Sequence, residues 1–275
     1  MDTNYAKPGY TQLKLYDRDY YKNSMDIDDI CYDGTYISSK LLRERFMKDA
    51  DHVIHGPWTS FCNGRFEMVF SFKNYRWISQ AKEWIQRSRS SWPDNSLIDK
   101  IVQYSVLFVP VGCKNSPRRD LEFRISFNVA AKVLVYSFSH VQLLCYALLK
   151  IILNHFIKPR DGDLLCSYFL KTIMFWVSEE SVESIWRPNN LLPCFDRCFK
   201  RLVYCFTYPT CLHYFIPALD FFEDRFSKSG HELLTGTLQS LYTSGWHCLL
   251  QTHLINPFNF NQQLLSIIRC LLCLV

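Results

Sequence analysis

The stretch EFRISFNVAAKVLVYSFSHVQLLCYALLKII, residues 122–152, decides the fold class because its pattern changes along its length. Apolar and polar residues alternate over Glu122–Phe127, which predicts a strand with one buried face. Apolar residues become nearly continuous after Val129, and Val141–Ile157 predicts a buried helix. The sequence therefore predicts mixed α/β structure before this stretch and all-helical structure after it.

The same patterns extend the prediction in both directions. On the N-terminal side they predict strands at 11–15, 66–72 and 106–111, and helices at 39–49, 77–87 and 93–104. On the C-terminal side the helix of residues 141–157 is expected to end before Pro159. Further helices are predicted at 164–177, 191–206, 217–226 and 231–250.

The predicted fold class is α+β, with a mixed α/β lobe followed by an all-helical lobe. The predicted domains are residues 1–135, residues 136–252 and an apolar tail at 253–275. The tail is interrupted by Arg269, and no apolar stretch reaches the roughly 20 residues that a spanning helix needs. We therefore expect no membrane span.

Composition excludes several classes of protein. The chain has 275 residues, of which 48% are hydrophobic and 21% are charged, so it is too apolar for a disordered chain. Most of its 12 cysteines lie within apolar runs, which favours buried free thiols in a reducing compartment. We expect the cytoplasm, with the nucleus as the alternative.

The basic residues give a weak electrostatic signal. The formal net charge is only +5, and the excess is concentrated in residues 51–130. A solvated face is favoured over a nucleic-acid groove, because nucleic-acid-binding proteins usually show a stronger basic stripe. The basic side chains concerned are Arg87, Arg89, Lys114, Arg118, Arg119 and Arg124.

Two motifs suggest metal ions. Asp26 and Asp28 form an Asp-x-Asp pair, which on a strand would put two carboxylates on one side, as paired Mg²⁺ ions require. The sequence before them lacks a Gly-Ser phosphate loop, so an acidic loop is the favoured interpretation.

The second motif consists of cysteines with one histidine. The spacing of these residues suggests a zinc site, but their apolar flanks favour core packing. They are Cys194, Cys198, Cys205, Cys211 and His213.

Polar residues within the apolar helices suggest a different chemistry. Lys150, Ser167 and Lys171 could bind a phosphate while Tyr168 stacks on a base. The competing interpretation is that both lysines extend to the surface along apolar helices and that Tyr168 belongs to the core. On composition alone the competing interpretation is favoured.

Several segments together resemble the Mab-21-like family, which includes cyclic GMP-AMP synthase and invertebrate cGAS-like receptors. The resemblance is ordered along the chain from Pro8 to about Leu250. It rests on residues 108–112, 122–127, 167–172, 175–176, 191–195 and 214–217.

The resemblance implies a nucleotidyltransferase-like lobe followed by a helical lobe of helix-hairpin-helix/helix-two-turn-helix type. It implies that Glu67 is the one remaining metal-binding carboxylate and that Arg124 contacts nucleotide in a cleft. It further implies that Lys150 and Ser167 bind phosphate and that Tyr168 stacks on the base.

The chain departs from the family pattern at its start. Relatives carry the Gly-Ser loop and the paired aspartates before the segment that resembles residues 8–13, and only seven residues precede Pro8 here. We therefore expect an N-terminally truncated pseudoenzyme without catalytic residues or a cofactor, which retains vestigial binding of ATP, GTP or double-stranded nucleic acid.

Two alternatives stay open. The first is an active cGAS-like nucleotidyltransferase of innate immunity, which would use Mg²⁺ to make a cyclic dinucleotide. The second is a non-enzymatic scaffold that acts through a protein partner.

Overall fold

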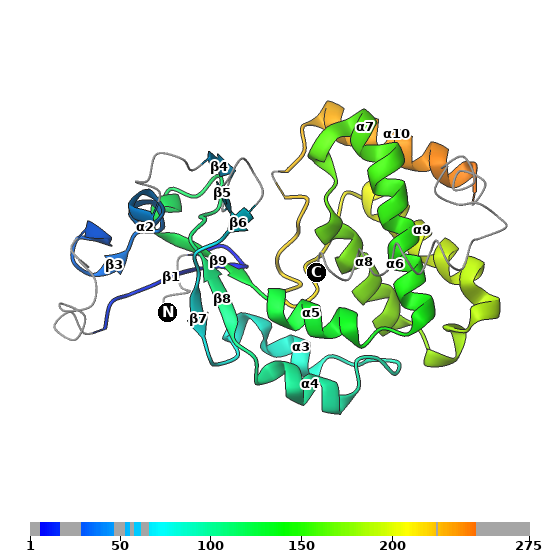
Figure 1. The fold of residues 1–275 in the computed structure, drawn as a ribbon, viewed down its shortest axis with the longest axis horizontal. Coiled ribbons are helices and arrows are strands. Elements are labelled where there is room, and N and C mark those ends of the chain that lie inside the picture. Colours follow the sequence, from blue (N-terminus) through cyan, green and yellow to red (C-terminus); the bar gives the residue numbers. More distant parts are fainter. Residues whose placement is uncertain are drawn as a thin grey trace. The chain divides into compact units, whose positions relative to one another are not determined.

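The computed structural model describes residues 6–16, 29–46, 53–55, 58–61, 66–223 and 225–245 (Figure 1). The chain forms two compact units. The strand unit comprises Met1–Glu83 and Lys100–Ala130, and the helical unit comprises Trp84–Asp99 and Ala131–Val275. The α+β class is observed, whereas the domain limits predicted from sequence stay predictions. The apolar tail at 253–275 lies outside the described residues.

The main sheet of the strand unit has four antiparallel strands in the order β1-β9-β8-β7. In the central strand β9, Phe123 and Ile125 are buried whereas Arg124 and Ser126 are partly exposed, so the predicted alternation is confirmed. The strands are β1 (Tyr10–Gln12), β7 (Phe72–Asn74), β8 (Val106–Val109) and β9 (Glu122–Ser126).

The single strand predicted at 66–72 is wrong. Phe66–Met68 forms β6, which pairs with β5, whereas β7 begins at Phe72 and pairs with β8 of the main sheet. Alternation of period two reports which face is buried but not which strand is the partner, so it could not reveal the break. The smaller sheets contain β2 (Cys31–Tyr32) with β3 (Tyr36–Ile37), and β4 (Val53–His55) with β5 (Trp58–Phe61) and β6.

Three α-helices precede β8 in the described part of the chain. In α2 the Ser38 hydroxyl accepts a hydrogen bond from the Leu41 amide at 3.2 Å and so caps the start of the helix. The helix predicted at 77–87 is shorter than expected, because Ser79–Ala81 forms a 3-10 turn before it. The bounds are α2 (Ser39–Phe46), α3 (Lys82–Gln86) and α4 (Asn95–Val102).

In the helical unit, α6 contacts both α8 and α9, and α9 contacts α8 and α10 (Figure 1). Apolar residues of α6 and α8 are almost all buried, which explains their nearly continuous apolar sequence. The bounds are α5 (Asn128–Tyr136), α6 (His140–Ile152), α7 (Lys158–Asp161), α8 (Ser167–Glu180), α9 (Leu191–Thr207) and α10 (Lys228–Thr243).

The helix predicted to end before Pro159 continues past it. A π turn at Leu153–Ile157 joins α6 to α7, and Pro159 lies in the first turn of α7, directly after the π turn. The run His140–Asp161 has 22 residues and is long and apolar enough to cross a membrane. Because 72% of its apolar window is buried inside the protein, it also fits a core helix.

The helix predicted at 217–226 is wrong as well. The segment forms turns, and Leu212 makes an isolated bridge with Asp220. The Asp220 carboxylate accepts hydrogen bonds from the amides of Cys211 and Phe222, both at 2.9 Å. These side-chain bonds replace the backbone bonds that a helix would make.

Candidate anion-binding site

The lysines singled out in the sequence lie on neighbouring helices of the helical unit. Lys150 is in the last turn of α6, and Lys171 is in the second turn of α8. Only 7% of Lys150 and 9% of Lys171 is exposed. Both residues are therefore largely buried, and whether their ammonium groups extend to the surface along the helices stays open.

The charges of these two lysines are not balanced by acids. Among the described residues, neither ammonium forms an ion pair with a carboxylate. The Lys150 ammonium lies 4.9 Å from the ring centre of Tyr146. Lys150 thus has an aromatic neighbour, and neither lysine has an acidic partner in the part of the chain that the structure describes.

The pKa of Lys171 reflects this arrangement. Burial, together with the positive charges of Lys150 and Lys132, lowers it from 10.5 to about 8. Burial also lowers the pKa of Lys150. Since the Lys150 charge disfavours the ammonium form of Lys171, an anion bound beside Lys171 would stabilise that ammonium.

Ser167 and Tyr168 begin α8 and lie near Lys171 along the helix. Ser167 is exposed and precedes Lys171 by four residues, so both lie on one face of the helix. Tyr168 is half-buried. The structure thus brings Lys150, Ser167, Tyr168 and Lys171 to the paired helices α6 and α8.

His213 positions Tyr168. Its Nδ1 atom accepts hydrogen bonds from the amides of Phe215 at 3.1 Å and Ile216 at 3.0 Å. Nδ1 therefore carries no proton, and the Nε2–H group donates to the Tyr168 hydroxyl at 3.1 Å. The Tyr168 ring also meets Phe221 edge to face at 5.2 Å. The sequence suggested only a zinc ligand for His213, because the turn of residues 213–216 gives no sequence signal.

Tyr146 is a second residue that the sequence did not single out. Its hydroxyl is buried and has no hydrogen-bond partner among the described residues, and burial raises its pKa. A buried polar atom without a partner is costly, so a ligand atom that reached it would supply a missing bond. Its place beside Lys150 adds a donor to the same region.

The other predicted site residues belong to the strand unit. Arg124 is a partly exposed residue of β9, and Glu67 lies in β6. The side chain of Glu67, like all of Asp26 and Asp28, lies outside the described residues. The described side chains include no group of three or more His, Cys, Asp or Glu that could hold a metal ion. The nucleotide contact of Arg124 and the metal role of Glu67 stay predictions.

Two of the basic residues of segment 51–130 are used inside the helical unit. Arg87 Nε lies 2.6 Å from Glu179 Oε1, and Arg89 Nε lies 3.3 Å from Glu179 Oε2. The Tyr214 hydroxyl donates to the same carboxylate at 2.6 Å. The guanidinium groups therefore balance a buried acid, and the interpretation of a solvated basic face is wrong for Arg87 and Arg89.

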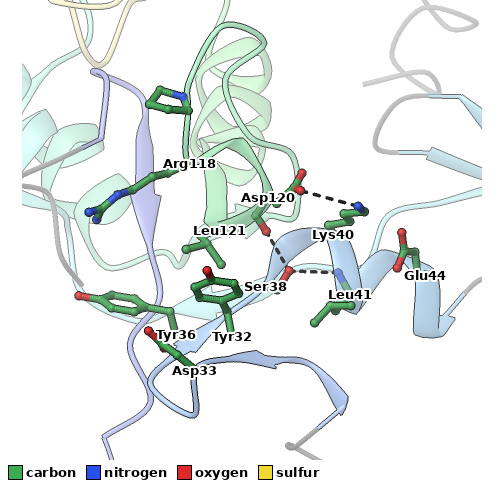
Figure 2. Close-up of a pocket in the computed structure, with 11 residues that line it drawn as sticks. Tyr32, Asp33, Tyr36, Ser38, Lys40, Leu41, Glu44, Arg118, Asp120 and Leu121 are labelled. Carbon is green, nitrogen blue, oxygen red and sulfur yellow. Dashed lines mark hydrogen bonds and ion pairs between the residues drawn. The ribbon is translucent and has the colours of Figure 1, made fainter.

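A pocket of about 640 Å³ lies in the strand unit (Figure 2). Lys40 pairs with Asp120 at 3.8 Å across it, and the Ser38 hydroxyl donates to the Asp120 carbonyl at 3.0 Å. The charged residues that line it are Asp33, Lys40, Glu44, Arg118 and Asp120. Its acids outnumber its bases, so it does not suit an anion, and no residue singled out as a site residue lines it.

Comparison with known proteins finds a family that matches part of the chain. Residues 142–239, which carry α6 to α10, match the family described as Mab-21 protein HhH/H2TH-like domain. The cyclic GMP-AMP synthases of Mus musculus and Sus scrofa are each 29% identical to this chain, over 105 and 108 residues. Through this segment the chain is similar to the Mab-21-like family.

The family resemblance predicted from the sequence is thus confirmed. The aligned part is 37% of this chain and spans about a fifth of each synthase, 21% and 22% respectively. The Mab-21-like segment contains Lys150, Ser167, Tyr168 and Lys171, whereas Arg124 and Glu67 lie before it.

Proposed function

We propose that this Mab-21-like chain binds the phosphates of ATP or GTP at Lys150 and Lys171, with Tyr168 next to the base. We further propose that it does so without nucleotidyl transfer. One observation carries the binding proposal: two buried lysines face each other's charge without a described acidic partner.

The physical reason is electrostatic. A phosphate between two ammonium groups replaces their repulsion with two attractions, which are strongest where water is scarce. The hydroxyl of Ser167 and the partnerless hydroxyl of Tyr146 supply further hydrogen bonds. The half-buried ring of Tyr168 offers a surface for stacking. The names of the two relatives describe synthesis of a molecule built from nucleotides, which agrees with this ligand class.

Calorimetric titration of the full chain with ATP and with GTP, without metal ions, tests the binding. Lys150→Gln and Lys171→Gln should each weaken binding by about tenfold or more, because each removes a charged hydrogen bond. Lys200→Gln is the matched control, since Lys200 is an exposed lysine of α9 in the same unit. Equal affinities for all four proteins, or no binding by the wild type, would contradict the proposal.

The absence of catalysis needs a separate test. The resemblance assigns only Glu67 as a metal-binding acid, and its role rests on that resemblance alone. Incubation with ATP, GTP, Mg²⁺ or Mn²⁺, and double-stranded DNA or RNA should give no cyclic dinucleotide. A product that disappears in Asp28→Ala would instead support the second candidate function, synthesis of a cyclic dinucleotide, which the names of the relatives favour.

A further inference from the structure

One face of α9 gathers basic and aromatic side chains. They are Arg197, Lys200, Arg201 and Tyr204, which occupy positions i, i+3, i+4 and i+7 and therefore share one side of the helix. Tyr208 follows at the end of the helix, and its ring centre lies 4.7 Å from that of Tyr204. Tyr204 is 50% exposed and Tyr208 is 59% exposed. This surface, which we call the α9 face, thus combines positive charge with exposed aromatic rings.

A pocket of about 220 Å³ lies at the basic end of the α9 face. This cationic pocket is lined by Glu180, Ser181, Arg197, Lys200 and Arg201 among others. The Glu180 carboxylate accepts hydrogen bonds from Arg201 at 3.0 and 3.3 Å and so balances that guanidinium. In the described part of the chain neither Arg197 nor Lys200 forms an ion pair with a carboxylate. Two positive charges therefore remain for an external anion.

Ser181 adds a buried hydroxyl to the cationic pocket. Only 3% of the residue is exposed, and its Oγ atom has no hydrogen-bond partner among the described residues. A buried hydroxyl without a partner costs free energy, so a ligand oxygen that accepted its hydrogen bond would be stabilised. The serine therefore indicates an oxygen-bearing ligand by an observation that does not depend on the basic side chains.

A second pocket, of about 330 Å³, adjoins the first, since Arg201 and Tyr204 line both. Its other described lining residues are uncharged, and we call it the apolar pocket; they are Ile173, Trp176, Cys205, Thr210, Cys211 and Leu212. The Trp176 indole N–H donates to the Leu212 carbonyl at 2.9 Å, which fixes the ring in the pocket wall. An apolar side chain would suit this pocket.

The difference between the two pockets favours one kind of anionic chain. A nucleic acid carries a phosphate at every nucleotide. Beside the apolar pocket those phosphates would meet Arg201 alone among the described lining residues, and Glu180 already balances its charge. A peptide can instead carry acidic side chains at one end and an apolar side chain at the other. Trp, Tyr and Arg are also the residues that contribute most to binding at protein interfaces.

We propose that the α9 face binds an extended acidic segment of a partner protein. The carboxylates of the segment pair with Arg197 and Lys200, and its apolar side chain enters the apolar pocket beside Trp176. Arg197 precedes Tyr204 by about two helical turns, roughly 10 Å, which about three residues of an extended chain span. The acidic and apolar positions of the segment are therefore expected about three or four residues apart.

Fluorescence anisotropy of labelled peptides, titrated with the full chain, tests the proposal. The probe carries three glutamates, a two-serine spacer and a leucine–phenylalanine pair, and it is made in both chain directions. At least one direction should bind with a Kd below about 100 µM. Probes with lysine in place of glutamate, or with serine in place of leucine and phenylalanine, should bind at least about tenfold more weakly.

Variants of the α9 face should weaken binding of the same probe. Arg197→Gln and Lys200→Gln should each do so by about twofold to fivefold, because ion pairs of exposed side chains contribute little. Tyr204→Ala should do so by about fivefold or more, because it removes aromatic surface from both pockets. The matched controls are Lys228→Gln in α10 and Tyr136→Ala in α5. Both residues are exposed and line neither pocket, so the affinity should not change.

Several results would overturn the proposal. They are no binding in either direction, equal binding of the lysine and glutamate probes, and wild-type affinity in Tyr204→Ala or in both cation variants. Tighter binding of a labelled single-stranded oligonucleotide that is lost in the same variants would also overturn it, because the face would then belong to a nucleic acid.

The inference does not depend on nucleotide binding at Lys150 and Lys171, because neither residue lines the two pockets of the α9 face. Lys200→Gln should therefore weaken binding of the peptide while leaving the affinity for ATP unchanged. Failure of one proposal is thus visible separately from failure of the other.

Discussion

At the scale of single residues, the buried charges of the helical unit differ in whether they are balanced. The Glu179 carboxylate pairs with Arg87 and Arg89 and accepts a hydrogen bond from the Tyr214 hydroxyl. These three partners offset the free-energy cost of removing the carboxylate from water. Lys150 and Lys171 have no described acidic partner. A balanced buried charge serves structure, whereas an unbalanced pair reduces stability and is the better sign of a binding function.

Replacing Lys171 should therefore stabilise the ligand-free chain. A pKa lowered from 10.5 to about 8 corresponds to roughly 3 kcal/mol against folding at neutral pH. Lys171→Met keeps the apolar stem, and we expect a gain of about 1–3 kcal/mol in the free energy of unfolding, measured with urea in chloride buffer.

The wild type and Lys171→Met should also differ in how their stability depends on pH. Between pH 8 and pH 10.5 the unfolded chain holds a proton at Lys171 that the folded chain has released, so wild-type stability rises with pH in this window. The advantage of Lys171→Met should be largest below pH 8 and should shrink as the pH rises to 10. An advantage that is constant from pH 7 to 10 would show that the lysine is already solvated.

Glu179→Gln should have the opposite effect. It leaves two guanidinium groups without their buried carboxylate, which costs about 3–5 kcal/mol. Its neighbour Glu180 also pairs with an arginine, Arg201, at 3.0 Å, but this pair is much more exposed. Glu180→Gln should therefore cost less than about 1 kcal/mol. Similar losses in the two variants, measured by urea unfolding, would contradict this account.

At the scale of elements, sequence patterns predicted the strands and helices whose formation depends on residues close to one another in the sequence. The alternation of Glu122–Phe127 and the apolar run of Val141–Ile157 gave a strand and a helix where the structure has them. Failures occurred where one contact decides the conformation, as at Asp220, whose carboxylate replaces helical hydrogen bonds. The pairing of α6 with α8 is a tertiary feature, so the sequence could name Lys150 and Lys171 but not their burial.

The start of α6 allows an element-scale prediction. Ser139 accepts a hydrogen bond from the Gln142 amide, and the Gln142 side chain accepts one from the Ser139 amide at 2.7 Å. Ser139→Ala should lower the free energy of unfolding by about 1 kcal/mol. Ser227→Ala removes the cap of α10, a helix at the periphery of the described chain, and should cost no more than that. If thermal unfolding shows a smaller loss of stability in Ser139→Ala than in Ser227→Ala, the expectation that the α6 cap contributes more to stability is wrong.

At the scale of the whole molecule, the two units divide the roles that the sequence assigned to one cleft. Lys150, Ser167 and Tyr168 belong to the helical unit, whereas Arg124 and Glu67 belong to the strand unit. The proposed phosphate binding at the lysines would therefore need only the helical unit. Nucleotide affinity that survives Arg124→Ala but not Lys150→Gln, measured by the same calorimetric titration, would support this division.

The salt cluster around Glu179 also determines how the protein can be dissected. The segment Trp84–Asp99 precedes the last strands of the sheet, yet its two arginines neutralise an acid of α8. A gene fragment that starts at Ala131 would encode α6, α8, α9 and α10 but would lose both counterions, so it should be recovered as insoluble or molten material. A fragment that also includes residues 84–99, joined through a short linker, would keep both arginine counterions of Glu179.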